Sequence, residues 1–218
     1  MTLRSPPTIR LRDGVDLQDP LKVVVSFLEA YPRLDLFDDP ASRSASFDEA
    51  DLRRANGNGA RIAAREKAAI LERRRAIERA LGAIAPDASL ATAASSVPWL
   101  PLRELFDAFA NIPGVGFAKM TKALHPKRPA LIPMLDSVVQ KYLVQDDGGA
   151  AVAFGERALT LARGYKRDLD RNRGAMRALR QQLAGRGIAL TEVRILDLLI
   201  WSVHEGSQSS RGASGGVA

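Results

Sequence analysis

Residues 105–124, which read LFDAFANIPGVGFAKMTKAL, have the pattern of two helices joined by a tight turn. Apolar residues at helical spacing end near Ala110, and a second helical pattern begins at Phe117. The turn between them carries glycines at two alternate positions, Gly114 and Gly116. Because glycine adopts backbone conformations that are closed to other residues, we expect Gly114 to close a helix–hairpin–helix.

The start of the second helix of this hairpin is expected to bind a phosphate. Since Gly116 has no side chain, a ligand can approach the free backbone N–H groups of the first helical turn. The helix dipole favours an anion there, and lysine residues follow closely. The alternative is a tight connection between two helices with no ligand. The residues expected to contact phosphate are Ile112, Pro113, Gly114, Val115, Gly116, Lys119 and Lys122.

A carboxylate follows the hairpin at the start of another expected helix. Three prolines within residues 126–133 favour an extended crossing after the second helix. Asp136 then stands before a helix expected over residues 137–145, 20 positions after Gly116. An aspartate at such a position is most often a plain N-cap, and capping would also hold its carboxylate rigidly.

The composition of the whole chain limits the chemistry available to it. With 218 residues it can form one compact domain or two small lobes that share a cleft. Cysteine is absent and the histidines are His125 and His204, so disulfides, thiolate catalysis, iron–sulfur clusters and a histidine-rich metal site are excluded. No metal or cofactor is therefore expected. The net charge of +7 is typical of a protein that binds nucleic acid.

Hydrophobic periodicity predicts an all-α protein without a convincing strand. Residues 1–17 and 85–98 are expected to be irregular, the latter as a connector between lobes. The last helix is apolar nearly all round and should be buried at the centre. The domain is expected to cover residues 1–205, followed by a disordered Ser- and Gly-rich tail over residues 206–218. The expected helices cover residues 20–31, 47–55, 61–83, 101–110, 117–124, 137–145, 151–167, 171–185 and 191–204.

The sequence also predicts where the protein resides. The N-terminus has no apolar segment of a signal peptide, and the longest apolar stretch, residues 195–203, is short and contains Asp197. Asp197 is expected to form a structural ion pair with Arg194 on the same helix face. We expect a cytoplasmic monomer that does not associate with membranes.

The five residues from Ile112 to Gly116 match the hydrophobic-Pro-Gly-Val-Gly signature of helix–hairpin–helix DNA repair proteins. In the helix–hairpin–helix (HhH-GPD-like) DNA glycosylase superfamily, a catalytic aspartate follows the hairpin at this same spacing, in a Val-Asp or Leu-Asp pair. Here that pair is Leu135-Asp136. The chain resembles this superfamily over about residues 101–145, which implies a two-lobed helical fold with a cleft between the lobes.

The resemblance implies a monofunctional DNA glycosylase that flips a modified or damaged base out of double-stranded DNA and excises it. Asp136 would be the catalytic residue, and the product would be an abasic site. Bifunctional members place a lysine nucleophile where this chain has Ala118, so no lyase activity is expected. The candidates for a wedge or for walls of a base pocket are Asn56, Asn58, Trp99, Phe117 and Tyr142, although each aromatic could equally pack in the core.

Residues 194–197, Arg-Ile-Leu-Asp, together with Trp201, also resemble a small actinobacterial family of uncharacterised domains within this superfamily. That branch includes anti-phage glycosylases acting on glucosylated hydroxymethylcytosine, so a hypermodified base of phage DNA and a role in antiviral defence are implied as one possibility. Two alternatives remain open. One is a non-catalytic DNA-binding module that keeps the hairpin. The other is a structure-specific nuclease, although no acidic cluster for divalent metals is apparent. Asp35, Asp38 and Asp39 lie in an expected loop and are more typical of turns and caps.

Overall fold

The computed structural model describes residues 8–31 and 43–212, with side chains described as far as residue 204. This part of the chain is mostly helical, which confirms the predicted class. Its α-helices are α1 (Pro20–Ala30), α2 (Glu49–Gly57), α3 (Ala64–Glu72), α4 (Arg74–Gly82), α5 (Trp99–Asp107), α6 (Phe117–Leu124), α7 (Ser137–Tyr142), α8 (Phe154–Arg171), α9 (Arg173–Ala184) and α10 (Glu192–Gly212). Short 3₁₀ turns lie at Ala94–Ser96, His125–Lys127 and Val144–Asp146.

A small hairpin precedes α1, where no strand was predicted. Strands β1 (Ile9–Arg10) and β2 (Asp16–Leu17) pair antiparallel, with Ile9 opposite Leu17. Gly14 has a φ of +85° in the connecting turn. A strand of two residues is too short to show an alternating pattern, which is why periodicity did not indicate it.

Most helix ends differ from the prediction by a few residues, and two differences are larger. The helix expected over residues 61–83 is divided into α3 and α4 at Arg73, whose φ of −88° and ψ of 1° interrupt the helical path. Helix α10 continues to Gly212, beyond Gly206, where the disordered tail was predicted to begin. Residues 213–218 lie outside the described part of the chain, as do Asp35, Asp38 and Asp39.

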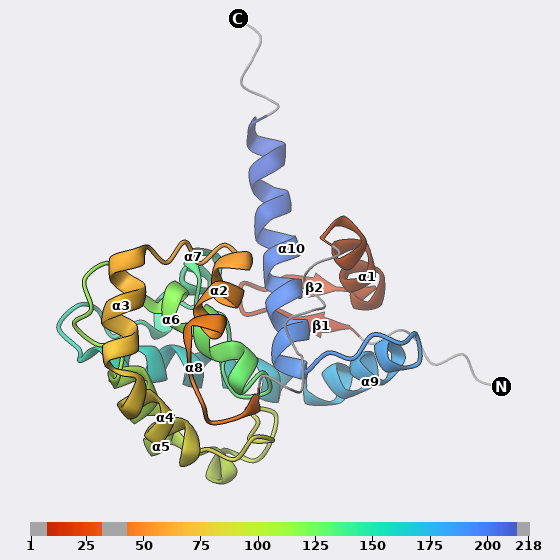
Figure 1. Ribbon diagram of the computed structural model, residues 1–218. Helices are drawn as coiled ribbons and strands as arrows, with labels where there is room; N and C mark the ends of the chain where they lie inside the picture. Colours follow the sequence, from red (N-terminus) through yellow and green to blue (C-terminus); the bar gives the residue numbers. More distant parts are fainter. Residues whose placement is uncertain (1–7, 32–42, 213–218) are drawn as a thin grey trace, which may run out of the picture.

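The first part of helix α10, residues 193–200, is buried at the centre of the molecule, as predicted, and the rest of the helix extends away from the other elements (Figure 1). Helix α1, the β-hairpin and α9 lie on one side of it, and α2 to α7 lie on the other. Helix α5 packs on α8, and both α1 and α7 pack on α10. Ile195, Leu199 and Ile200 of α10 are completely buried in a hydrophobic cluster that includes residues from both sides.

Aspartate side chains cap the first two helices. The Asp19 carboxylate accepts a hydrogen bond from the backbone N–H of Lys22 at 3.1 Å and caps α1. Asp48 caps α2, and the Asp51 side chain accepts in return from the Asp48 N–H at 3.0 Å, which completes a capping box. Among the described residues, no helix is long and apolar enough to cross a membrane.

A buried arginine fixes the crossing that leads from α6 to Asp136. Arg128 is only 1% exposed, and its guanidinium donates to backbone carbonyls alone. It bonds to Leu81 and Ile84 at the end of α4 at 2.7 to 3.0 Å, and to Arg43 and Lys127 at 2.7 and 2.6 Å. One side chain therefore satisfies the last carbonyls of a helix and holds two other segments against it.

We expect Arg128→Met to lower the free energy of unfolding by about 3 kcal/mol or more, because each buried carbonyl left without a donor costs about 1–3 kcal/mol. Urea unfolding followed by circular dichroism measures the loss. Arg53→Met is the matched control, since this exposed arginine pairs only with Glu49 on the same helix surface, and it should cost less than about 1 kcal/mol. Equal losses for the two variants would contradict the role assigned to Arg128.

Candidate functional site

The turn between α5 and α6 has the local geometry predicted for it. The Val115 N–H donates to the Ile112 carbonyl at 3.0 Å and closes the turn. Gly114 has a φ of +81°, which confirms the expected left-handed glycine. Gly116 is the N-cap of α6 and is exposed, and a Cβ placed on it would meet nothing within 4 Å. The space in front of the first turn of α6 is therefore open at this residue.

An internal carboxylate lies against this turn, which the sequence did not predict. Both carboxylate oxygens of Glu66 accept hydrogen bonds from the Lys119 ammonium, at 2.8 and 2.6 Å. These bonds, together with one from the Ala63 N–H, lower the pKa of Glu66. A Cβ on Gly114 would overlap the Glu66 carboxylate. Lys119, predicted to contact a ligand phosphate, is thus already engaged by an anion of the chain itself.

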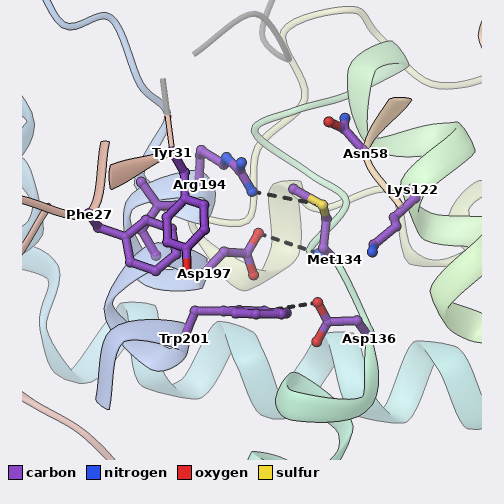
Figure 2. Close-up of a pocket in the computed structure, with 10 residues that line it drawn as sticks. Phe27, Tyr31, Asn58, Lys122, Met134, Asp136, Arg194, Asp197 and Trp201 are labelled. Carbon is purple, nitrogen blue, oxygen red and sulfur yellow. Dashed lines mark hydrogen bonds between the residues drawn. The ribbon is translucent and has the colours of Figure 1, made fainter. Parts of the chain in front are cut away.

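Lys122 and Asp136 both line one cavity of about 190 Å³ (Figure 2). The cavity lies where α1, the end of α2, α6, the crossing before α7, and α10 come together. Its lining residues are Phe27, Tyr31, Asn58, Lys122, Met134, Asp136, Arg194, Asp197, Leu198 and Trp201. Three of the predicted site residues, Asn58, Lys122 and Asp136, are therefore brought together by the fold.

Asp136 combines the predicted N-cap role with a place in the cavity wall. Its Oδ1 accepts hydrogen bonds from the backbone N–H groups of Val138 and Val139, both at 3.1 Å. Its Oδ2 accepts from the indole N–H of Trp201 at 2.9 Å. The residue before it is fixed as well, since the Leu135 N–H donates to the Thr121 hydroxyl of α6 at 3.0 Å. Both oxygens of a carboxylate that is 6% exposed are thus held in a defined orientation.

Lys122 points into the cavity from α6 (Figure 2). Desolvation lowers the pKa of its ammonium, and the positive charges of Arg194 and Arg61 lower it further, while the charge of Asp136 raises it. The residue stands four positions, about one helical turn, after Ala118. An amine and a carboxylate therefore both line the cavity, and the amine lies one turn after Ala118.

A second carboxyl group, that of Asp197, lines the cavity from α10. It is 1% exposed, and burial raises its pKa to about 7, with a further contribution from the charge of Asp136. Oδ1 lies 3.0 Å from the Tyr165 hydroxyl, and Oδ2 accepts from the Met134 N–H at 3.4 Å. Arg194, its expected ion-pair partner, also lines the cavity, and its charge acts to lower the pKa of Asp197.

Four residues predicted to form the wedge or pocket do not line this cavity: Asn56, Trp99, Phe117 and Tyr142. The amide of Asn56 bonds to the backbone N–H and C=O of Ile62, at 2.6 and 3.0 Å, and closes its own loop. Trp99 donates to the Ala94 carbonyl, and Phe117 packs on Phe154 at 4.8 Å between ring centroids. The Tyr142 hydroxyl accepts from the Arg12 N–H. These side chains therefore stabilise the fold through backbone hydrogen bonds or ring packing.

The aromatic residues that do line the cavity were not predicted to do so. Phe27 lies on α1, and Tyr31 is the C-cap that directly follows it. Trp201 was expected to be part of the buried last helix and of the motif that resembles the family. Its hydrogen bond to Asp136 joins residues 65 positions apart, so no local pattern could indicate it. Among the residues with described side chains, no group of three or more His, Cys, Asp or Glu could hold a metal ion.

Comparison with known proteins adds a family and no activity. A family model described as a family of unknown function (DUF6308) matches residues 26–204, which is more than half of the chain. No curated protein and no solved structure matches.

Proposed function

We propose that this chain, which belongs to the DUF6308 family of unknown function, is a monofunctional DNA glycosylase that removes a modified or damaged base. The observation that carries the proposal is the setting of Asp136. Its carboxylate is held by three N–H donors at the wall of a cavity, 20 residues after a glycine turn that opens a helix. This is the arrangement that the resemblance to helix–hairpin–helix glycosylases leads one to expect.

The size and lining of the cavity suit a single flat heterocycle. A cavity of about 150 Å³ holds one benzene ring, and this one measures about 190 Å³. Phe27, Tyr31 and Trp201 supply aromatic surface on one side, while Lys122 and Asn58 lie opposite (Figure 2). Aromatic faces stack on a base, and polar groups hydrogen-bond its edge, which is how flipped bases are held.

The proposed reaction assigns the chemistry to Asp136. A base is flipped into the cavity at a cost of a few kcal/mol of unstacking. When its glycosidic bond breaks, the sugar acquires oxocarbenium character, and the fixed Asp136 carboxylate stabilises this positive charge and orients a water molecule for attack. One carboxylate and one water are sufficient for release of the base and formation of an abasic site.

The turn before α6 is proposed to hold the DNA backbone beside the cavity. The N–H groups of the first turn of α6 point away from the helix next to the open face of Gly116. The proposal places the two lobes of a glycosylase on the two sides of α10, with double-stranded DNA across the cleft between them. The net charge of +7 favours this partner.

The experiment that tests the function incubates the protein with a panel of DNAs and then treats them with alkali. The panel includes plain duplex, alkylated and deaminated duplex, and phage DNA with hypermodified cytosine. Strand breaks that require alkali identify abasic sites and therefore a glycosylase. Breaks that need magnesium and no alkali identify a nuclease, and tight binding without breaks identifies a non-catalytic module.

Asp136→Asn is expected to reduce base release by about 100-fold or more, since a neutral amide cannot stabilise the developing cation. Folding should be retained because asparagine is an equally good N-cap. Single-turnover release measures the effect, and DNA affinity should stay within a few fold. Asp19→Asn, the same change at the exposed N-cap of α1, is the control and should leave release unchanged. Normal turnover by a folded Asp136→Asn variant excludes the catalytic assignment.

Gly116→Val is expected to weaken binding to every DNA by a similar factor, because a branched side chain would block phosphate approach to the start of α6. The φ of −99° and the open space around Gly116 permit valine, so the protein should fold normally. Gly174→Val is the matched control at another exposed glycine with open space around it. Fluorescence anisotropy with modified and plain duplexes gives both affinities. If the two valine variants bind alike, the turn is only a connector.

Borohydride is expected to trap no covalent complex with DNA, because Ala118 stands where a nucleophilic lysine would be needed. Denaturing gels after reduction reveal any trapped species, with a bifunctional glycosylase as positive control. Lys122→Ala provides the check within this chain, since Lys122 is the amine that lines the cavity. A complex that forms with the parent and disappears in Lys122→Ala would contradict the monofunctional chemistry.

A further inference from the structure

We infer that Lys122 selects the base, and that the cavity takes a base with a carbonyl oxygen on the edge that faces this lysine. Uracil and hypoxanthine belong to this class, whereas cytosine and adenine carry an amino group in the same place. The inference rests on the proposed function and names its substrate class. It gives Lys122 a contact with the base, where the sequence predicted a contact with phosphate.

Lys122 is shielded from water but has no partner for its charge. It points into the cavity from α6, and desolvation acts on its ammonium (Figure 2). In the part of the chain whose side chains are described, this ammonium makes no hydrogen bond or ion pair. Three other lysines that are partly or fully shielded, Lys119, Lys127 and Lys166, each have a carboxylate partner at 2.6 to 2.9 Å. A shielded charge without a partner costs free energy, and a ligand in the cavity would supply the missing acceptor.

A second donor without an acceptor lies on the same side of the cavity. The Nδ2 atom of Asn58 is buried and has no hydrogen-bond partner among the described residues. The turn after α2 brings this residue beside α6, since a Cβ on Gly59 would lie 3.9 Å from Nζ of Lys122. The aromatic side chains of the cavity lie opposite (Figure 2). A ring stacked on them would therefore turn its edge toward N–H donors.

The ammonium group decides which bases fit this arrangement. It has three donors and no acceptor. A carbonyl oxygen accepts from it, whereas an amino group would direct its own N–H toward Lys122 and leave donors on both sides unpaired. Arg194 and Arg61 add positive charge around the same site, which disfavours alkylated bases that are cations. Thymine and guanine also carry a carbonyl oxygen, but their pairing in normal duplex makes flipping more costly than for a mismatched base.

The same contact assists the step that breaks the bond. As the bond between C1′ and the base nitrogen breaks, its electron pair goes to the base, and the negative charge spreads onto the carbonyl oxygen. The ammonium of Lys122 keeps its proton and stabilises this charge through the hydrogen bond. Water adds to C1′, Asp136 takes the proton that the water loses, and this proton passes through solvent to the released base. Lys122 and Asp136 thus stabilise the two opposite charges of the reaction.

Binding to duplexes that cannot be cleaved tests the selection without any reaction. Each duplex carries one 2′-fluoroarabino nucleotide of uracil, cytosine, hypoxanthine or adenine opposite an abasic analogue, so base pairing makes no contribution. The parent should bind the carbonyl base of each pair at least about tenfold more tightly than the amino base. Lys122→Met should reduce both ratios to within about twofold, because it keeps the apolar stem and removes the donor. Lys22→Met, at an exposed lysine of α1, is the control and should keep the parent ratios.

The melting temperature of Lys122→Met shows whether its ammonium is free in the protein alone. The variant should melt at or above the temperature of the parent, since it loses a shielded charge that has no partner. A lower melting temperature would mean that the fold already binds the ammonium, and this would overturn the proposal. An equal loss of affinity for all the duplexes would identify a phosphate contact, and a parent that prefers the amino bases would contradict the selection; each of these also overturns it.

Single-turnover release separates this inference from the proposed function. Uracil and hypoxanthine in mismatched duplexes should be released by the parent, and Lys122→Met should be at least about tenfold slower on both, while Lys22→Met keeps the parent rate. Selective binding that depends on Lys122, without release from any DNA, would overturn the glycosylase and leave the selection in place. Base release with equal rates in the parent and in Lys122→Met would overturn the role of Lys122 and leave the glycosylase in place.

Discussion

A helical segment that is apolar on nearly every face must be enclosed by the rest of the chain, and in this protein that segment is residues 193–200 of α10. Burial of large apolar side chains supplies most of the free energy that stabilises a fold. Ile195, Leu199 and Ile200 become buried only when elements from both halves of the sequence pack around them. Two polar residues, Arg194 and Asp197, lie on one face within this apolar segment, and Trp201 follows Asp197 by about one helical turn. The cavity lies where these three side chains face α6 and the crossing before α7.

The parts of the fold that depend on residues adjacent in the sequence could be predicted. Helix α6 was predicted with the bounds it has, because a glycine turn sets its start. The cap at Asp136 and the positive φ of Gly114 follow from local backbone geometry in the same way. The burial of α10 follows from its composition. The two-residue strands and the break at Arg73 could not be predicted, since each is a tertiary effect on a few residues.

The candidate site was predictable only on the side that the hairpin provides. Lys122 and Asp136 lie on or near the motif, and Asn58 was predicted as a wedge residue, whereas Phe27 and Trp201 come from elements that approach only after folding. Trp99, Phe117 and Tyr142 were predicted because aromatic residues often line base pockets, and all three instead contribute to packing or to hydrogen bonds with the backbone. Residue type near a motif is thus weaker evidence for a cavity wall than the direction in which a helix faces.

The ion pair between Glu66 and Lys119 changes how the turn before α6 would meet a polyanion. A free surface lysine that contacts a phosphate releases cations condensed on the DNA and so makes affinity depend on ionic strength. Lys119 already has a carboxylate partner within the chain. A phosphate at Lys119 would exchange one anion for another, with little net gain in charge neutralisation. The number of counterions released on binding would therefore be smaller than the basic residues near the turn suggest, and the open N–H groups beside Gly116 would provide most of the attraction there.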